Sequence, residues 1–377
     1  MKVEESAAAA PPAARRTAPR RVAAATAAVA IAAATVAPAA ASGLWEPAGA
    51  TSGEPSELDV LVERGRQLAD FAHQFEYMGA QARRDRDLRS ARRYRAQMHQ
   101  VGEQAIDVLE RALALAPDDP DLHFALADAY YSFVCDYYDN DVPMPARRDA
   151  AARKAIAHWD RFEQIAPDDP RRYNALRGWS HPHSLAGPPA LVDFPYQFER
   201  SIALTKLGGD DNYRRALADY EFLLDWAEAA PEPLTLFTAQ NVTNAAELLM
   251  ALGRLDEAID YYRLGLDLAD DPLYYYGLAV ALDRDGQWES ALEVMRDGAA
   301  RDAAPLAALG KDSVFFIPRG DVHYYYGLGY EALGDRDKAL THFREFVATS
   351  PGRYRDQAQR HIDALTAKRG RARRRAR

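Results

Sequence analysis

Apolar residues recur at helical spacing along most of this chain, and the first such stretch begins near residue 57. An apolar stripe with steps of three and four residues predicts an amphipathic helix that runs to about Ala80. Its members are Leu58, Leu61, Leu68, Phe71, Phe75 and Met78. Ser56 is followed three residues later by Asp59, a pattern typical of a capping box, so we expect the helix to begin there.

Further along, one pattern of two short helices joined by a tight turn recurs. Three copies read NVTNAAELLMALGRLDEAIDYYRLGL (241–266), YYYGLAVALDRDGQWESALEVM (274–295) and YYYGLGYEALGDRDKALTHFREFV (324–347). Two earlier half-copies read QAIDVLERALALAPDDP (104–120) and KAIAHWDRFEQIAPDDP (154–170). A repeat of this length is the sequence sign of a solenoid, in which each unit buries its apolar face on the next. We therefore expect an array of helical hairpins from Gln104, closed by a helix at about 354–367.

The array is expected to be irregular. A helix is predicted over 121–133, and a weaker helix pair over 197–207 and 212–229. Three insertions interrupt the repeats, at 134–149, 179–195 and 305–321. The second insertion contains four prolines and one glycine, which is typical of a loop.

The hairpins resemble the tetratricopeptide repeat, a family with small and aromatic residues at fixed offsets over about 34 residues. The matching residues are Tyr330, Gly334, Ala339, Phe343 and Pro351 in the third copy, Gly286 and Ala291 in the second, and Gly253 and Ala258 in the first. The resemblance implies an all-α fold, an α-solenoid of about five or six hairpins, each made of a helix A and a helix B. It also implies that the small residues let the two helices approach and that the glycine forms the turn between them.

Composition agrees with a folded, helical body. Ala, Leu, Arg, Asp and Glu are abundant, and runs of Val and Ile are few. The formal net charge is −9, of which residues 1–41 contribute +3 and the last ten residues +7, which leaves −19 for the rest. So acidic a body argues against a nucleic-acid partner, because binding by counterion release requires a cationic footprint.

The N-terminal 41 residues resemble a secretory signal peptide. An Arg-containing start is followed by an uncharged stretch over 22–41 that ends in three alanines, a small-residue cleavage site. One alternative is an uncleaved anchor, with 22–41 as a membrane tether; another is the Ala-rich leader of a cytoplasmic protein. We predict an exported protein of the periplasm or cell envelope. Residues 42–56, rich in Gly, Pro, Ser and Ala, are expected to be a linker.

The N-terminal helices predicted over 57–103 carry a cluster of arginines. Its members are Arg83, Arg84, Arg86, Arg89, Arg92, Arg93 and Arg95. One interpretation is contact with phosphate or anionic lipid. The sequence favours the other, a solvated helix face partly paired with Asp85 and Asp87. The solenoid is then expected over 104–367, and the basic tail 368–377 is expected to be disordered.

The family resemblance implies a concave groove lined by the second, fifth, ninth and twelfth residues of each unit. Such positions include Asp121, Phe124, Asp128, Tyr131, Gln240, Thr243, Glu247, Tyr276, Asp283, Asp321, Tyr324 and Glu331. An aromatic, acidic surface repels anions, so we expect a protein or peptide partner that is amphipathic or basic. In this register Tyr276 and Tyr324 face the groove, whereas Tyr275 and Tyr326 pack. In the alternative, several of the groove tyrosines are packing residues.

The sequence offers little catalytic or metal chemistry. His181 and His183 form an HxH pair that Cys135 could approach, but a metal site needs three or four ligands and nothing fixes the others. No P-loop, GxSxG or HExxH motif occurs, and a single cysteine cannot form an internal disulfide. We therefore predict no catalysis, no cofactor and no metal.

These observations predict an exported scaffold or adaptor that binds protein partners through its groove. One alternative is a ligand-binding or enzyme-associated protein with a site formed by the insertions 134–149 and 179–195. Another is a cytoplasmic regulatory protein built from the same repeats.

Overall fold

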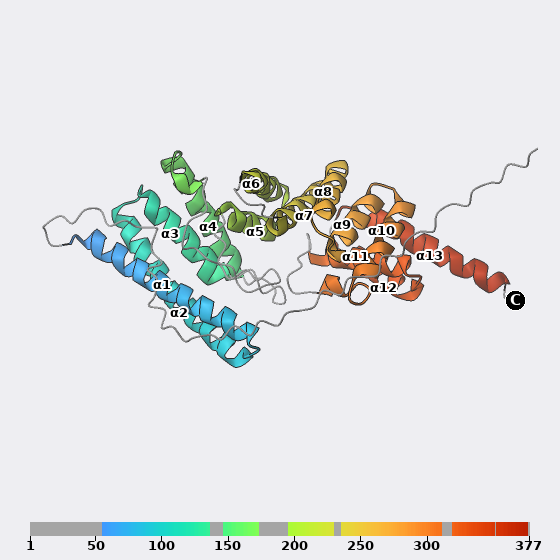
Figure 1. Cartoon of the computed structure of the whole chain (residues 1–377), viewed down its shortest axis with the longest axis horizontal. Coiled ribbons are helices and arrows are strands. Elements are labelled where there is room, and N and C mark those ends of the chain that lie inside the picture. Colours follow the sequence, from blue (N-terminus) through green and yellow to red (C-terminus); the bar gives the residue numbers. More distant parts are fainter. Residues whose placement is uncertain are drawn as a thin grey trace, which may run out of the picture. The chain divides into compact units, whose positions relative to one another are not determined.

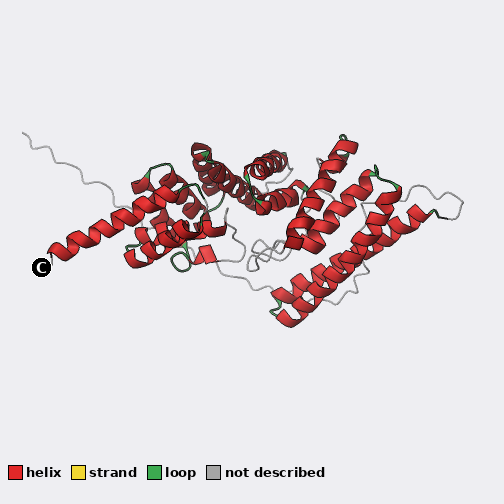
Figure 2. Cartoon of the chain, turned by 180° about the vertical axis from the view of Figure 1, so that it is seen from behind, coloured by secondary structure: helices red, strands yellow, loops and turns green. Residues whose placement is uncertain are grey.

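The computed structural model describes residues 55–135, 146–172, 195–229, 235–310, 319–350 and 352–375. These residues form α-helices with short 3-10 and π-helical segments, and none of them lies in a β-strand (Figures 1 and 2). The helices are α1 (Glu57–Arg84), α2 (Leu88–Leu115), α3 (Pro120–Tyr130), α4 (Ala146–Ile165), α5 (Gln197–Leu207), α6 (Asp210–Glu228), α7 (Thr235–Leu252), α8 (Leu255–Leu268), α9 (Pro272–Arg284), α10 (Trp288–Arg301), α11 (Val322–Ala332), α12 (Arg336–Thr349) and α13 (Arg355–Arg375). The predicted all-α fold is confirmed.

Consecutive helices pack in pairs. The pairs are α1–α2, α3–α4, α5–α6, α7–α8, α9–α10 and α11–α12, and α13 packs against α12. Each pair also packs on the next, through α2–α3, α4–α5, α6–α7, α8–α9 and α10–α11. The described part of the chain thus has five repeat hairpins, from α3 to α12, between a longer hairpin α1–α2 and the closing helix α13. The predicted solenoid of about five or six hairpins is confirmed.

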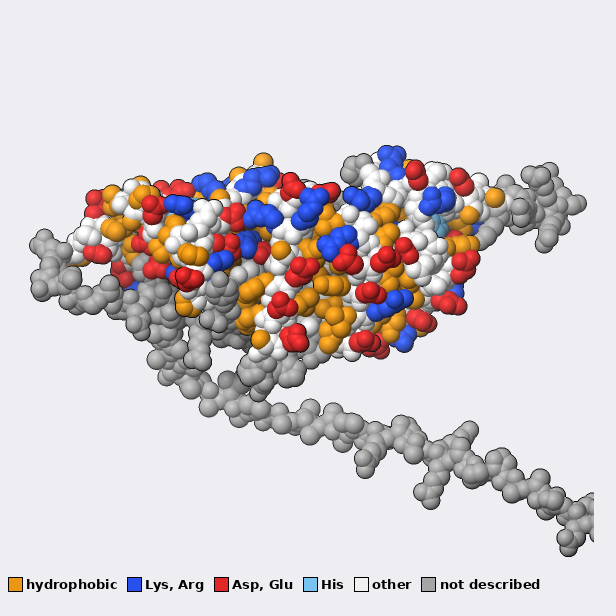
Figure 3. All heavy atoms as spheres, turned by 90° about the horizontal axis from the view of Figure 1, so that it is seen from above, with side chains coloured by type: hydrophobic (Ala, Val, Ile, Leu, Met, Phe, Trp, Pro, Cys, Tyr) orange, Lys and Arg blue, Asp and Glu red, His pale blue; other side chains and the backbone are white. Residues whose placement is uncertain are grey.

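The outer surface mixes charges of both signs with apolar patches. On the face shown in Figure 3, Lys and Arg side chains lie beside Asp and Glu side chains. Within the described residues, none of the helices is both long enough and apolar enough to span a bilayer. The stretch 22–41, the candidate tether, lies outside the described residues.

The α1–α2 hairpin begins where the sequence predicts. The Ser56 side chain accepts a hydrogen bond from the Asp59 N–H (3.2 Å), and Asp59 Oδ2 accepts one from the Ser56 N–H (3.0 Å), so the capping box is confirmed. α2 then runs unbroken from Leu88 to Leu115. The boundary expected between residues 103 and 104 therefore lies inside a helix, which joins the N-terminal hairpin directly to the array.

Glycine forms the turn between the two helices in three repeats, as the family resemblance implies. Gly253, Gly286 and Gly334 have φ angles of 81°, 89° and 81°. This left-handed conformation is readily adopted only by a residue without a Cβ atom. The three turns therefore confirm the role predicted for these glycines.

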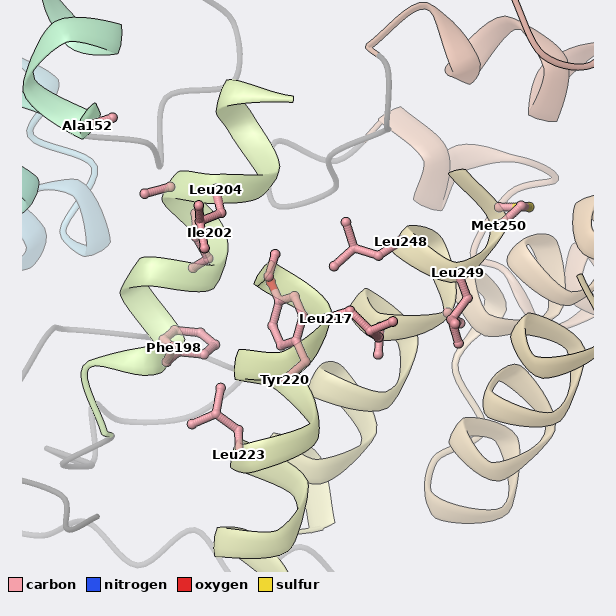
Figure 4. Close-up of a cluster of buried hydrophobic side chains, with 14 of the residues drawn as sticks. Ala152, Phe198, Ile202, Leu204, Leu217, Tyr220, Leu223, Leu248, Leu249 and Met250 are labelled. Carbon is pink, nitrogen blue, oxygen red and sulfur yellow. The ribbon is translucent and has the colours of Figure 1, made fainter. Parts of the chain in front are cut away.

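Small and large side chains alternate in the core. Ala258, Ala291 and Ala339, at the predicted sites of close helix approach, have no exposed surface, and neither have Ala105 and Ala155. Figure 4 shows one part of the core, formed by buried side chains of α5, α6 and α7: Phe198, Ile202, Leu204, Leu217, Tyr220, Leu223, Leu248 and Leu249. Burial of a side chain of this size contributes roughly 1.5–3 kcal/mol.

Two helical glycines in the first hairpin should respond to alanine in opposite ways. A Cβ atom at Gly102 would lie 2.3 Å from Phe133 Cβ, so we expect Gly102→Ala to lower the free energy of unfolding by about 2 kcal/mol. A Cβ atom at Gly79 would meet Tyr94 Cβ at an ordinary 3.5 Å, so Gly79→Ala should raise that free energy by about 0.5–1 kcal/mol through helix propensity. Urea unfolding of the two variants checks this, and equal effects would contradict the packing described.

The closing helix is longer than the sequence pattern predicts. α13 continues to Arg375, past the end expected near residue 367. Ala358, Ile362 and Leu365 on its first half are buried. This half also reaches the residues predicted to line the groove.

Candidate protein-binding surface

The predicted groove residues all lie on the first helices of the repeats or on short segments next to them. α3 and the following π-helix (Tyr131–Cys135) hold Asp121, Phe124, Asp128 and Tyr131; α7 holds Gln240, Thr243 and Glu247; α9 holds Tyr276 and Asp283; and α11 with the preceding 3-10 turn (Arg319–Asp321) holds Asp321, Tyr324 and Glu331. We call these twelve residues the A-helix surface. Eight of them are buried and the other four are half-buried. The expectation of an open groove at these residues is therefore wrong, and the reason is that other segments of the chain cover them.

At α3 the cover is helix α1, through His73. His73 Nε2 lies 3.3 Å from Asp128 Oδ2, and His73 Nδ1 lies 3.2 Å from Glu76 Oε2. Burial opposes a charge on His73, but the hydrogen bonds to Asp128 and Glu76 raise its pKa to about 10. The imidazolium therefore donates a hydrogen bond to Glu76 and forms an ion pair with Asp128, and Asp128 also accepts a hydrogen bond from Ser132 Oγ (2.9 Å).

The rest of the α3 surface is covered by Arg171, which follows α4. Its Nη2 lies 2.6 Å from the Asp121 carboxylate, and its guanidinium carbon lies 5.1 Å from the centre of the Phe124 ring. Tyr131 packs on the ring of Trp159, with 5.8 Å between ring centres. A basic side chain and an aromatic one thus occupy the positions that a partner would need.

At α9 and α11 the cover is α13. His361 Nε2 lies 3.0 Å from Asp283 Oδ2, His361 Nδ1 lies 2.7 Å from Glu331 Oε2, and Gln357 Nε2 donates to the Asp283 carbonyl (2.7 Å). Although burial opposes the charged form, the hydrogen bonds to Asp283 and Glu331 raise the pKa of His361 to about 9. Because this pKa lies above the ordinary 6.5, the ionic contact stabilises the fold fully below pH 6.5 and is lost as the pH rises through about 9.

The residues just before α13 close the C-terminal end of α7. Tyr354 Oη donates to the Met250 carbonyl (2.8 Å), and Arg353 Nη1 donates to the Leu252 carbonyl (3.1 Å). Carbonyls in the last turn of a helix lack partners within it, and positive charge is favoured there. The start of the closing segment is thus fixed to α7, and α13 continues over α9 and α11.

A buried ion pair links α9 to the start of α11. Arg284 Nη2 lies 2.7 Å from Asp321 Oδ2, and the two side chains are 2% and 4% exposed. The guanidinium lies over the rings of Tyr324 (4.7 Å) and Tyr354 (4.3 Å). Burial raises the pKa of the Asp321 carboxyl, and the Arg284 charge opposes that rise. The positive charge that balances Asp321 is therefore Arg284 of the same chain and not a residue of a partner.

Glu247 on α7 has an environment that favours the neutral carboxyl. The hydroxyls of Tyr262 and Tyr325 both donate to its Oε1, whereas Oε2 is buried and accepts no hydrogen bond from the described residues. Burial raises the pKa of Glu247 to about 7, although the hydrogen bond from Tyr325 lowers it. The folded chain therefore holds this proton at pH values where the unfolded chain has released it.

Ionisation of the buried Glu247 carboxyl lowers the free energy of unfolding as the pH rises, and we expect Glu247→Gln to remove this loss. Between the ordinary pKa of 4.5 and the folded value of about 7 the native state binds the extra proton, so stability falls as the pH rises through this window. The variant should match the parent near pH 4.5 and exceed its free energy of unfolding by on the order of 3 kcal/mol at pH 8. Urea unfolding of both chains across this range is the measurement, and a difference that does not change with pH would contradict the assignment.

Tyr276 shows how an insertion covers the A-helix surface. Its Oη donates to Asp302 Oδ2 (3.0 Å) and accepts from the Leu306 N–H (3.2 Å), and Leu306 is itself buried. Leu306 belongs to the insertion predicted over 305–321. The first part of that insertion therefore lies on α9.

The predicted roles of the neighbouring tyrosines are reversed. Tyr276 and Tyr324, expected to face the groove, have no exposed surface. Tyr275, expected to pack, is half-buried, and the Arg301 guanidinium lies 4.4 Å from its ring centre. Tyr326 is likewise half-buried. Tyr276 and Tyr324 are therefore packing residues, as the alternative interpretation states.

On α7 the A-helix surface includes Gln240, a polar side chain that is partly accessible. Gln240 is half-buried, whereas Thr243, one turn further on, uses its hydroxyl to donate to the Ala239 carbonyl (3.1 Å). Gln240 therefore marks the place where this surface can be probed without disturbing a buried contact.

A pair of histidines recurs in the second and last hairpins, and sequence reasoning missed it. The Nδ1 atoms of His123 and His158 lie 2.9 Å apart, and those of His323 and His342 lie 3.0 Å apart. Burial and the neighbouring His123 lower the pKa of His158 to about 4, so His158 is neutral at pH 7. Two similarities in the sequence could have revealed these pairs. DLHF (121–124) resembles DVHY (321–324), and KAIAHW (154–159) resembles KALTHF (338–343), with the histidine at the same position in each.

The metal and ligand hypotheses gain no support from the described part of the chain. No group of three or more His, Cys, Asp or Glu side chains in it is placed to hold a metal ion. Cys135 is buried, with its Sγ 3.7 Å from the Arg148 carbonyl. His181, His183 and most of the two insertions predicted to form a ligand site lie outside the described residues, so that alternative stays a prediction.

Family models for the tetratricopeptide repeat (TPR) match three segments of the chain. The matches cover residues 103–132, 239–272 and 321–352, which correspond to the end of α2 with α3, to α7–α8 and to α11–α12. The chain is a tetratricopeptide repeat protein. No curated protein matches this TPR chain.

Solved structures that are similar to this TPR protein include other TPR proteins. YrrB, described as a TPR protein with an unusual peptide-binding site, is 13% identical, with 67% of this chain and 96% of YrrB covered and a TM-score of 0.33. A tetratricopeptide repeat protein from Parabacteroides merdae is 11% identical, with 82% and 98% covered and a TM-score of 0.35. The TPR domain of P58(IPK) is 11% identical, with 85% and 71% covered and a TM-score of 0.33. At these scores the likeness carries no argument about function.

Proposed function

We propose that this TPR protein is an interaction scaffold that binds basic, amphipathic helical segments of other proteins on its A-helix surface and has no catalysis of its own. The observation that carries the proposal is the position of α13. Its buried residues Ala358, His361, Ile362 and Leu365 have the spacing of an amphipathic helix. Arg and Lys outnumber Asp and Glu in it by eight to two.

The A-helix surface and α13 have complementary chemistry. Asp283 and Glu331 are carboxylates that attract cations and repel anions, and His361 meets both of them as an imidazolium. A segment of another protein with a cation at the place of His361 would make the same contacts. Because α13 is covalently attached, its effective concentration at the surface is on the order of millimolar, and a partner must compete with it.

A peptide with the sequence of residues 353–377 tests this preference. Its binding is measured by fluorescence anisotropy to the full chain and to the full chain with His361→Ala, in which the internal helix has lost its two charge-assisted hydrogen bonds. Hydrogen bonds to charged groups are worth about 1.5–3 kcal/mol, so the peptide should bind the variant at least about tenfold more tightly than the parent. The matched control is Gln359→Ala, which changes an exposed residue on the same helix whose side chain donates to Asp363.

Two outcomes would count against the scaffold proposal. One is a peptide that binds the parent, the His361→Ala chain and the Gln359→Ala chain equally. The other is an acidic helical peptide of the same length that binds as well as the basic one. Either result would show that the A-helix surface does not select for positive charge.

We further propose that the protein acts in the periplasm or cell envelope. The support is the signal-like pattern of residues 1–41, which lies outside the described residues. Cell fractionation with N-terminal sequencing tests this. We expect a mature N-terminus near Ser42 in the envelope fraction, and an intact Met1 in the cytosol would contradict it.

A further inference from the structure

The closed end of the α1–α2 hairpin extends beyond the helices that it packs on. We call residues 77–95 the hairpin tip. The hairpin meets α3 and its continuation at His73, which contacts Asp128, and at His99, which bonds the Phe133 carbonyl. α1 continues from His73 to Arg84, about 16 Å at the helical rise per residue, and both Figure 1 and Figure 2 show this end beyond the ends of α3 and α4.

Five of the seven arginines of the tip are exposed, and each of the two acids beside them accepts a hydrogen bond. Asp87 Oδ1 accepts from the Ser90 N–H (3.0 Å) as the cap of α2, and the Asp85 carboxylate accepts from Gln81 Nε2 (3.2 Å). The exposed arginines of the tip are Arg83, Arg86, Arg89, Arg92 and Arg93. These arginines form a solvated face, as the sequence interpretation expects. The hydrogen bonds from Ser90 lower the pKa of Asp87 most and the Arg93 charge lowers it further, so the pairing with this acid is partial.

Large apolar side chains are exposed in the same place. Tyr77 is 49% exposed, Met78 40% and Leu88 60%. Tyr77 and Met78 lie on the last turns of α1, and Leu88 begins α2, so all three flank the turn that carries the arginines. Large apolar side chains exposed together are typical of an interaction site, whereas a face that contacts only water has none of the same need for them.

We propose that the hairpin tip docks onto an anionic lipid bilayer. Residues 77–95 carry seven arginines and two aspartates, a charge of +5, whereas the other residues together carry −14. An anionic surface therefore attracts the tip, as it also attracts the basic tail 368–377, and repels the acidic rest of the chain. Arg83, Arg86 and Arg89 meet the headgroups, Met78 and Leu88 enter the upper acyl region, and Tyr77 stays at the interface.

Positive charge and exposed apolar side chains together favour a bilayer over the other anionic partners. Binding to a nucleic-acid backbone requires positive charge alone and would leave the apolar side chains of Met78 and Leu88 exposed. An acidic peptide bound by the arginine cluster would leave the apolar side chains of Met78 and Leu88 exposed. A deformable lipid interface accepts both the arginines and the apolar side chains.

Vesicle co-sedimentation of the full chain tests the proposal. Vesicles of phosphatidylcholine alone are compared with vesicles that contain roughly one-quarter phosphatidylserine, at low and at raised salt. The tip variant replaces Arg83, Arg86 and Arg89 with Gln. The matched control replaces Arg153, Arg296 and Arg344 with Gln. These residues are exposed on α4, α10 and α12, and both variants lose three positive charges.

We expect the parent chain to bind the anionic vesicles and not the neutral ones, and to release them as salt rises. The tip variant should bind at least about tenfold more weakly, and the control should stay within about twofold of the parent. Met78→Gln with Leu88→Gln should weaken binding severalfold at both salt levels. All of these side chains are exposed, and unchanged circular dichroism and thermal unfolding would confirm that the variants fold.

Several results would overturn the proposal. If neither vesicle binds, or if the tip variant and the control lose equal affinity, the tip is not a bilayer contact. If a chain that ends at residue 367 loses all binding while the tip variant keeps it, the basic tail holds the membrane instead. Binding of an acidic protein to the tip, with no vesicle bound, would also reject it.

Discussion

Replacement of Asp283 by Ala is expected to lower the free energy of unfolding by about 3–5 kcal/mol. Asp283 is fully buried and accepts hydrogen bonds from the Tyr324 hydroxyl and the His361 imidazolium. Without it, a buried hydroxyl and a buried cation lose their acceptor, and the cost of leaving such groups unpaired exceeds the value of the bonds themselves. Urea unfolding followed by circular dichroism measures the loss.

Asp285 provides the matched control for this variant. It lies two residues further on, is exposed, and accepts a hydrogen bond from Gln287. Asp285→Ala should change the free energy of unfolding by less than about 0.5 kcal/mol. Hydrogen exchange should also show that Asp283→Ala loosens α13 first, and a variant that retains full protection of α13 would contradict the proposed contact.

Replacement of Arg284 by Ala should have an effect of similar size, about 3–5 kcal/mol. The change leaves the buried Asp321 carboxylate without its cation and removes a guanidinium that lies over two tyrosine rings. The pair joins α9 to the start of α11, so the loss should appear as separation of the last hairpin from the one before it.

Two comparisons give this prediction its specificity. Arg301→Ala removes an exposed ion pair with Asp270 and should cost less than about 1 kcal/mol. Arg284→Met combined with Asp321→Leu removes both charges and should recover much of the loss, because a buried pair can often be replaced by apolar residues of similar volume. If the double variant is less stable than Arg284→Ala, the cost arises from packing and not from an unpaired charge.

The helical hairpins could be predicted from the sequence because their determinants are local. Gly253, Gly286 and Gly334 adopt the left-handed turn that the family pattern requires, and Ser56 caps α1 as predicted. Each of these features depends on residues within a few positions of one another. For the same reason the predicted A-helix surface lies on the first helices of the repeats.

The exposure of that surface could not be predicted, because it depends on segments far away in the sequence. His361 reaches Asp283 across 78 residues, and Tyr354 reaches Met250 across 104. Leu306 covers Tyr276 from an insertion that the repeat pattern does not describe. The repeat pattern specifies which side chains share one face of a helix. Whether that face is exposed to solvent depends on the distant segments that pack on it.

The arginine cluster shows a similar limit. Its spacing could be read from the sequence, and Asp85 and Asp87 were the nearest acids. The structure gives Asp87 a capping role and gives Asp85 a hydrogen bond from Gln81, so these carboxylates are only partly available to the arginines. Capping competes with ion pairing for the same carboxylate, and the balance depends on where the turn falls.

In-cell photo-crosslinking from position 240 tests the central claim most directly. A photoreactive residue in place of Gln240 lies on the accessible part of the A-helix surface, and one in place of Leu264, which is 46% exposed on α8, serves as the control. We predict that position 240 captures another protein, through a helical segment with net positive charge, and that position 264 does not. Capture of the same proteins from both positions, or of acidic segments from position 240, would contradict the account.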